Sequence, residues 1–132
     1  MTYRLTGATV DFRVPGAIVL AYTIDGEEPR DGSMTFSTTF ISADGDHVEQ
    51  LGFKLVDRRV VAAFSFNHSA TADIMQRNYG MNPGRQGNIW TIGFPLDALG
   101  RARGGTWRAD LDIEGEDRGA VIGTASTTLS EE

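Results

Sequence analysis

The chain has 132 residues, which fits a single domain, and its 40% hydrophobic and 23% charged residues are typical of a folded globular protein. Its formal net charge of −6 repels a phosphate backbone, so we expect no nucleic-acid partner. Cysteine is absent, which excludes disulfides, thiolate metal sites and cysteine nucleophiles.

The sequence shows no apolar segment of the kind that enters a membrane. Residues 1–7 lack the apolar run of a signal peptide. The longest apolar stretch, residues 17–22, is too short to cross a bilayer. We therefore expect a soluble, cytoplasmic protein with no membrane partner.

Five stretches in the first half of the chain alternate apolar with polar side chains and are rich in β-branched and aromatic residues. They predict β-strands at residues 10–14, 18–24, 34–40, 51–55 and 60–66. Asp-Gly pairs, which favour tight turns, lie between them at residues 25–26, 31–32 and 44–45. Short turns join antiparallel neighbours, whereas parallel strands need long crossovers. We therefore expect an antiparallel arrangement.

The alternation stops at residues 67–88, which we expect to form a long loop or a short helix. Ser69 suits the N-cap of a helix over residues 70–78, and Gly80 and Pro83 interrupt regular structure after it. Loops of this length usually have a functional purpose, so this segment is the first place to search for a site.

Beyond the interruption, residues 89–94 predict another strand, and Pro95 to Gly100 predicts a single helical turn. Apolar and charged residues alternate strictly over residues 107–113, which predicts a strand with one buried face. An acidic turn leads into a last strand at 120–129, and residues 130–132 are expected to form a frayed end.

Together these elements predict a single all-β domain over residues 1–132, with about eight strands. The expected architecture is an antiparallel β-sandwich, immunoglobulin-like or jelly-roll-like. A small eight-stranded antiparallel β-barrel has the same periodicity and is the alternative. Aromatic bulk on the predicted inner face favours the filled sandwich, and it comes from Phe36, Phe40, Phe53, Phe64, Phe66, Trp90, Phe94 and Trp107.

The candidate ligand-binding residues are polar or aromatic side chains in or near the 67–88 segment: Asn67, His68, Arg77, Tyr79 and Trp90. A histidine near a tyrosine and an arginine is a conceivable acid–base set, but the spacing matches no catalytic motif, so no catalytic residue is assigned. With two histidines and no cysteine, we expect no metal site, and no motif indicates a cofactor.

Three functions stay open. The leading hypothesis is a non-enzymatic binding module that contacts a protein partner or a carbohydrate through the 67–88 segment and a sheet face rich in Thr and Ser. That face contains Thr35, Ser37, Thr39, Thr124, Ser126 and Thr128.

One alternative is a cofactor-free β-barrel enzyme of the cyclase or isomerase type, or a carrier for an apolar small molecule. The 67–88 segment would then cover a cavity lined by residues such as Tyr22, Trp90 and Trp107. The other alternative is a self-assembling structural subunit, a homo-oligomer joined through an edge strand or the Thr/Ser face.

Overall fold

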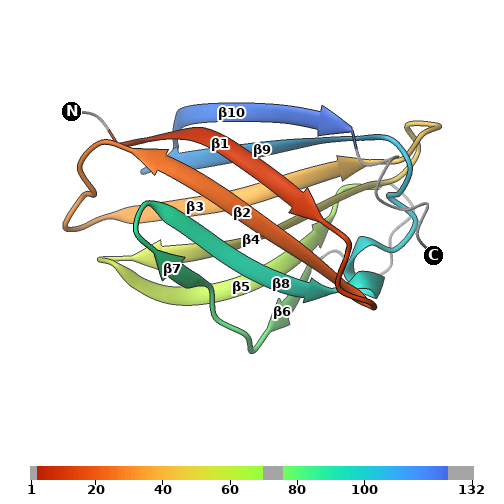
Figure 1. Ribbon diagram of the computed structural model, residues 1–132, viewed down its shortest axis with the longest axis horizontal. Helices are drawn as coiled ribbons and strands as arrows, with labels where there is room; N and C mark the ends of the chain where they lie inside the picture. Colours follow the sequence, from red (N-terminus) through yellow and green to blue (C-terminus); the bar gives the residue numbers. More distant parts are fainter. Residues whose placement is uncertain (1–2, 70–75, 125–132) are drawn as a thin grey trace.

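The computed structural model describes residues 3–69 and 76–124, which form two antiparallel β-sheets packed face to face (Figure 1). The strand order is β1-β2-β8-β7 in the four-stranded sheet and β10-β9-β3-β4-β5-β6 in the six-stranded sheet. No pairing among the described strands joins the two sheets into one closed ring. The predicted β-sandwich is therefore confirmed, and the barrel alternative is wrong.

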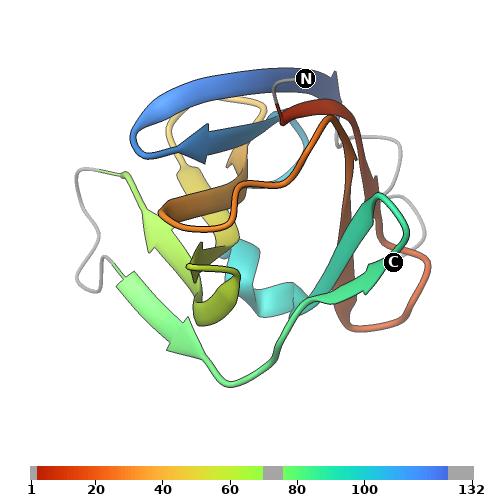
Figure 2. The same ribbon diagram turned by 90° about the vertical axis from the view of Figure 1, so that its left-hand side faces the viewer.

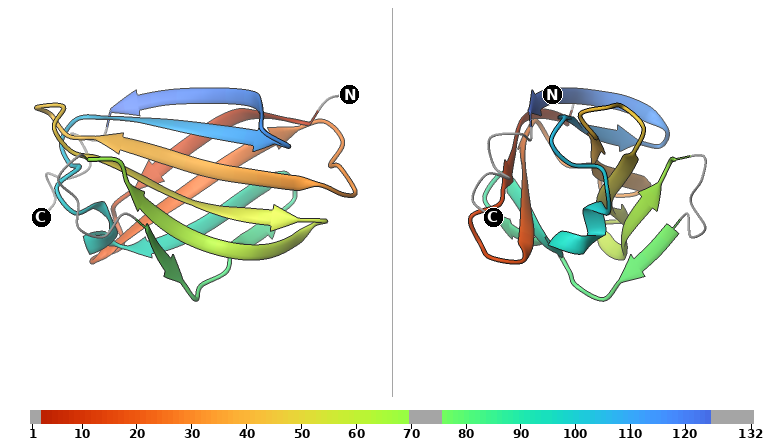
Figure 3. Two further views of the ribbon diagram at one scale, coloured as in Figure 1. Left: turned by 180° about the vertical axis from the view of Figure 1, so that it is seen from behind. Right: turned by 90° about the vertical axis from the view of Figure 1, so that its right-hand side faces the viewer.

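The four-stranded sheet contains β1 (Arg4–Asp11), β2 (Ala17–Asp25), β8 (Ile89–Pro95) and β7 (Gly84–Gln86). The six-stranded sheet contains β10 (Glu116–Thr124), β9 (Thr106–Ile113), β3 (Ser33–Ile41), β4 (Val48–Val56), β5 (Arg59–Asn67) and β6 (Gln76–Tyr79). The predicted helical turn is present as η1 (Leu96–Leu99), which follows β8 and lies across one end of the sandwich (Figure 3). No helix in the described ranges is long and apolar enough to cross a membrane.

Four aromatic rings from both sheets fill the centre of the sandwich. Tyr22 and Trp90 come from the four-stranded sheet, Phe36 and Phe53 come from the six-stranded sheet, and the ring centroids in contact lie 4.9 to 5.9 Å apart. The Tyr22 hydroxyl forms a buried 2.7 Å hydrogen bond with Thr38, which satisfies its polar end. We call these four residues the aromatic quartet, and it leaves the middle of the fold packed.

The inner-face prediction is wrong for two residues of β5. Ala63 and Ser65 are buried on the inner face, whereas Phe64 and Phe66 are half-buried on the outer face. Successive side chains of a strand point to opposite faces, so only one of these two sets can point inward. Apolar residues occupy both faces of β5, and hydrophobicity alone therefore selects the wrong set.

The 67–88 segment also differs from the expected loop or helix. Residues 76–79 form β6, which pairs with β5, and residues 84–86 form β7, which pairs with β8. A helix reaching residue 78 is therefore wrong, because the exposed edge of β5 offers backbone partners that a strand can use. Residues 70–75, the first part of that predicted helix, lie outside the described residues. Figure 2 shows the chain crossing from β6 in one sheet to β7 in the other.

Candidate functional site

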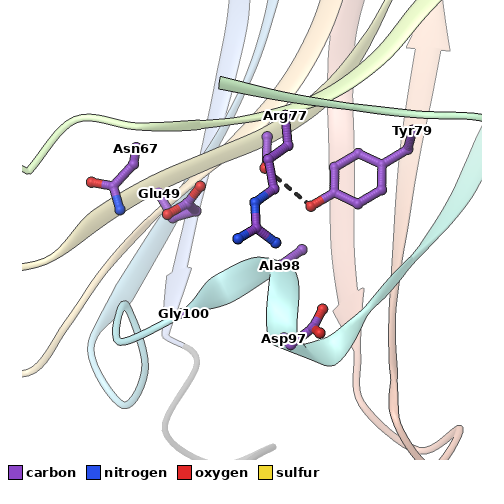
Figure 4. A pocket seen from close by; sticks show the side chains of 8 residues that line it. Glu49, Asn67, Arg77, Tyr79, Asp97, Ala98 and Gly100 are labelled. Atoms are coloured by element: carbon purple, nitrogen blue, oxygen red, sulfur yellow. Dashed lines mark hydrogen bonds between the residues drawn. The ribbon is translucent and has the colours of Figure 1, made fainter. Parts of the chain in front are cut away.

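A polar cavity lies at one end of the sandwich, between η1 and the inner face of β4, β5 and β6 (Figure 4). Its volume is about 110 Å³. We call it the Glu49 pocket, and it is lined by Glu49, Ser65, Asn67, Arg77, Tyr79, Asp97, Ala98 and Gly100.

Strand register brings the polar lining together. Glu49 on β4 pairs with Asn67 on β5, and Ser65 on β5 pairs with Arg77 on β6. Paired residues point to the same face, and so do residues two apart on one strand, which adds Tyr79 to the set. Further along β4 the same inner face is apolar, so the pocket begins where the hydrophobic core ends.

Glu49 is a buried carboxylic acid at the floor of the pocket, with only 7% of its surface exposed. Burial raises its pKa from 4.5 to about 7, while the charge of Arg77 and the hydroxyl of Ser65 lower it by less. Within the described ranges no basic side chain forms a salt bridge with this carboxyl. Desolvation therefore dominates, and the group is poised to change charge near neutral pH.

Tyr79 is held in place by one polar and one apolar contact. Its hydroxyl lies 3.1 Å from the buried hydroxyl of Ser65, the interaction drawn as a dashed line in Figure 4. Its ring meets Phe94 edge-on, with centroids 5.4 Å apart. The phenol group is therefore oriented before any ligand arrives.

The opposite wall of the pocket is η1 and the turn that ends it. Ala98 is buried and small, and Gly100 has a φ of 56°, a left-handed conformation that suits glycine. These two small residues leave the space that the pocket occupies. Asp97 is exposed and adds a second carboxyl at the mouth (Figure 4).

A second hollow of about 270 Å³ adjoins the pocket and shares Glu49, Asn67 and Gly100 with it. Its other lining residues are His47, Val48, Ser69, Leu99, Arg101 and Ala102. Asn67 Oδ1 accepts a 2.7 Å hydrogen bond from the backbone N–H of Ser69, so the amide nitrogen of Asn67 is left to act as a donor.

The structure brings three of the five predicted binding residues together, since Asn67, Arg77 and Tyr79 all line the Glu49 pocket. His68 lies elsewhere, because the residue after Asn67 points to the opposite face. Its Nε2 is 3.0 Å from Oε1 of Gln50, and its ring packs edge-on against an outer-face phenylalanine. Trp90 belongs to the aromatic quartet, and its Nε1 donates to the Tyr3 hydroxyl at 3.3 Å.

Sequence reasoning missed Glu49, Ser65 and Asp97. A usable signal exists for Glu49, because it shares the inner face of β4 with Leu51, Phe53 and Leu55. A carboxylate in register with three buried apolar side chains is rare in a strand without a functional reason. The predicted strand began at residue 51, which placed Glu49 outside the pattern.

The Thr/Ser face is less available than the sequence suggests. Ser37 is buried and accepts a 2.9 Å hydrogen bond from Nε2 of Gln50, while Thr35 and Thr39 are half-buried. Ser126 and Thr128 lie outside the described residues, as does the expected frayed end.

No group of three or more His, Asp or Glu side chains that could hold a metal ion occurs in the part of the chain that the structure describes. No known protein family, curated protein or solved structure matches the chain.

Proposed function

We propose that this protein is a binding module that takes a small polar ligand in the Glu49 pocket, with Asn67, Arg77 and Tyr79 as contacts. The observation that supports this most strongly is the buried carboxyl of Glu49 beside an exposed cation. Burying a carboxyl costs free energy unless a partner compensates it, so its place at the floor of a cavity favours a ligand as that partner.

The size and lining of the pocket define the kind of ligand. Its volume of about 110 Å³ lies well below the roughly 300–1,000 Å³ of sites that enclose a drug-sized molecule. A small polar headgroup fits, and the rest of the ligand would remain at the mouth or extend into the adjoining hollow. The hydroxyls of Ser65 and Tyr79 and the amide of Asn67 are suitable hydrogen-bond partners for it.

The packing of the interior favours this proposal over a carrier of apolar molecules. Tyr22 and Trp90, which a carrier would use to line its cavity, pack against Phe36 and Phe53 instead. The Glu49 pocket is lined mostly by charged, amide and hydroxyl side chains, and the adjoining hollow shares Glu49 and Asn67 with it. An apolar ligand would leave those groups desolvated and unpaired.

One observation favours a second candidate function, proton transfer to or from a bound substrate. A carboxyl whose pKa is about 7 can both hold and release a proton at neutral pH, which is the property of an efficient general acid or base. Glu49 would then be the acid–base group, with Tyr79 as a hydrogen-bond donor to the substrate.

The binding function is tested by following backbone amide resonances of the ¹⁵N-labelled full chain by NMR. The added compounds are glucose, acetate, methylamine and glycine, which together cover uncharged, anionic, cationic and zwitterionic ligands. We expect at least one compound to shift the resonances of Glu49, Ser65 and Arg77 with saturable dependence on its concentration. If none of the four shifts them, the pocket is not a binding site for small polar molecules.

Two variants serve as the matched pair in the same experiment. Arg77→Ala removes the exposed cation of the pocket and should abolish the saturable shifts caused by acetate or glycine, the two compounds that carry a carboxylate. Arg59→Ala removes an exposed arginine at the opposite end of the neighbouring strand and should leave them unchanged. New signals from a converted compound, lost in Glu49→Gln, would favour proton transfer over simple binding.

A further inference from the structure

We propose that the Glu49 pocket selects a small zwitterion, a ligand that carries a protonated amine and a carboxylate on a short chain, as a free α-amino acid does. This inference rests on the proposed binding function and names its ligand class. The ammonium group would lie at the floor beside Glu49, and the carboxylate would lie at the rim beside Arg77.

The first reason is that the pocket holds two opposite charges apart. Glu49 and Arg77 project from β4 and β6, and β5 lies between these strands, so about 10 Å separates their backbones. Their side chains turn into the same space (Figure 4) without forming a salt bridge with each other. A ligand with one charge of each sign would satisfy both groups at once.

The second reason is that the two charges differ in burial, which sets the orientation of the ligand. Glu49 is buried, so the attraction of a cation beside it offsets the cost of desolvating the charged carboxylate, and an ammonium group adds three hydrogen-bond donors. Arg77 is exposed, and its planar guanidinium matches a carboxylate through two parallel hydrogen bonds. An amine therefore fits the floor, and a carboxylate fits the rim.

The third reason is the charge of the whole pocket. Its described lining contains two carboxyls, those of Glu49 and Asp97, and one guanidinium, that of Arg77. A simple anion would be repelled by the two carboxyls, whereas a simple cation would leave the guanidinium without a partner. A zwitterion avoids both problems.

The adjoining hollow allows the ligand to carry a substituent. The two spaces meet at Glu49, Asn67 and Gly100, so a group on the carbon between the amine and the carboxylate can pass from one to the other. The amide nitrogen of Asn67 lies at this junction as a donor. Larger amino acids are therefore compatible with a pocket that encloses only their charged head.

Isothermal titration of the full chain with glycine and three analogues tests the selection. Acetate lacks the amine, methylamine lacks the carboxylate, and glycine betaine keeps both charges but has no N–H donor. We expect glycine to bind at least about tenfold more tightly than each analogue, because each lacks a charge-assisted hydrogen-bonding group. If acetate or methylamine binds as tightly as glycine, the inference is overturned.

The pH dependence of glycine binding gives a second readout. Glu49 must be deprotonated to pair with the ammonium group, so affinity should rise between about pH 6 and pH 8 as its pKa near 7 is passed. The other titratable or charged groups facing Glu49 are Arg77 and Tyr79 from β6, Asp97 from η1, Arg101 beyond it, and His47 before β4. The one histidine among these groups is His47.

Variants separate the contribution of Glu49 from that of its neighbours. Glu49→Gln should weaken glycine binding about tenfold or more and remove the rise with pH, whereas His47→Gln should keep the rise. Arg77→Gln should weaken glycine binding but leave methylamine binding unchanged. Arg59→Gln is the control and should bind glycine like the natural chain. A rise with pH that persists in Glu49→Gln would contradict the proposed orientation.

The outcomes distinguish this inference from the proposed function on which it rests. If glucose shifts the pocket resonances and glycine does not, the binding module stands and the zwitterion is wrong. If none of the four compounds of the NMR panel shifts them, both proposals fail together.

Discussion

At the scale of single residues, Glu49 is costly to the fold. Burial raises the pKa of its carboxyl to about 7, so the folded protein holds this proton more tightly than the unfolded chain, whose carboxyl has a pKa near 4.5. Folding stability therefore falls as pH rises from about 4.5 to about 7, and the full cost is present above that range. A group that reduces stability at neutral pH is retained more readily for function than for structure.

We predict that Glu49→Gln stabilises the protein at pH 8 by about 1–2 kcal/mol and has little effect at pH 5, where the natural carboxyl is already protonated. The expected gain is smaller than the free energy that corresponds to the full pKa shift, because the cavity beside the carboxyl opens to solvent, which screens the charge. Urea unfolding at the two pH values measures the difference. If the substitution has the same effect on stability at pH 5 and at pH 8, Glu49 does not change charge between these two pH values.

Only glycine fits at position 52, because β3 and β4 approach each other closely there. A Cβ atom there would lie 2.2 Å from the carbonyl oxygen of Phe36 and 2.9 Å from Cα of Ser37, both backbone atoms of β3. Backbone cannot move aside as a side chain can, so a methyl group would force β3 and β4 apart.

We therefore expect Gly52→Ala to lower the free energy of unfolding by about 3 kcal/mol. Gly93→Ala on β8 is the matched control, because the nearest atom to its added Cβ is 3.8 Å away, an ordinary contact. Its effect should be below about 1 kcal/mol in the same urea titration. Similar losses in the two variants would show that the close approach at Gly52 does not matter.

At the scale of elements, β6 supplies two side chains that line the Glu49 pocket, Arg77 and Tyr79. It is a four-residue edge strand, paired to β5 and anchored by the contact between Tyr79 and Phe94. Short edge strands depend on such side-chain anchors more than central strands do.

We predict that Tyr79→Phe costs about 1 kcal/mol of stability, since it removes only the hydrogen bond with Ser65. Tyr79→Ala should cost about 2 kcal/mol and speed the hydrogen exchange of the β6 amides, because it also removes the ring that packs on Phe94. Exchange in β6 that is the same for both variants would argue against the anchoring role of the ring.

The comparison of sequence with structure is clearest at this scale. Alternation of side chains predicts the strands that contain Phe36, Trp90 and Trp107, because their inner and outer faces differ in polarity. It fails for β6 and β7, which are short and mostly polar and owe their form to the neighbouring strands β5 and β8. Pairing across the sheet is a tertiary effect that periodicity within one segment does not report.

Part of the candidate site was also predictable from the sequence. Arg77, Tyr79 and Asn67 were candidates because they lie in the interrupted segment, and they do line one pocket. That they bind a ligand stays a prediction. Glu49 was not found because the predicted strand began at residue 51, whereas β4 begins at Val48. The pocket around it forms only through the register of β4 against β5 and the position of η1, which comes from a distant part of the chain.

At the scale of the whole molecule, the aromatic quartet links the two sheets through direct ring contacts. Phe36 is completely buried and contacts Tyr22 and Trp90 across the sandwich and Phe53 beside it. Phe66 has a similar size but lies half-buried on the outer face. The pair allows the contribution of a phenylalanine between the sheets to be compared with that of one outside them.

We predict that Phe36→Leu lowers the free energy of unfolding by about 2 kcal/mol, whereas Phe66→Leu changes it by less than about 1 kcal/mol. Tryptophan fluorescence comes from Trp90 in the four-stranded sheet and Trp107 in the six-stranded sheet, so it reports on side-chain packing, whereas far-ultraviolet circular dichroism reports on the backbone of all the strands. The two signals should give coincident urea transitions in the natural chain and in both variants, since neither sheet covers its apolar face without the other. Separate transitions would mean that the sheets unfold independently. The Glu49 pocket, which lies between one sheet and η1, would then not be held in one arrangement by the whole fold.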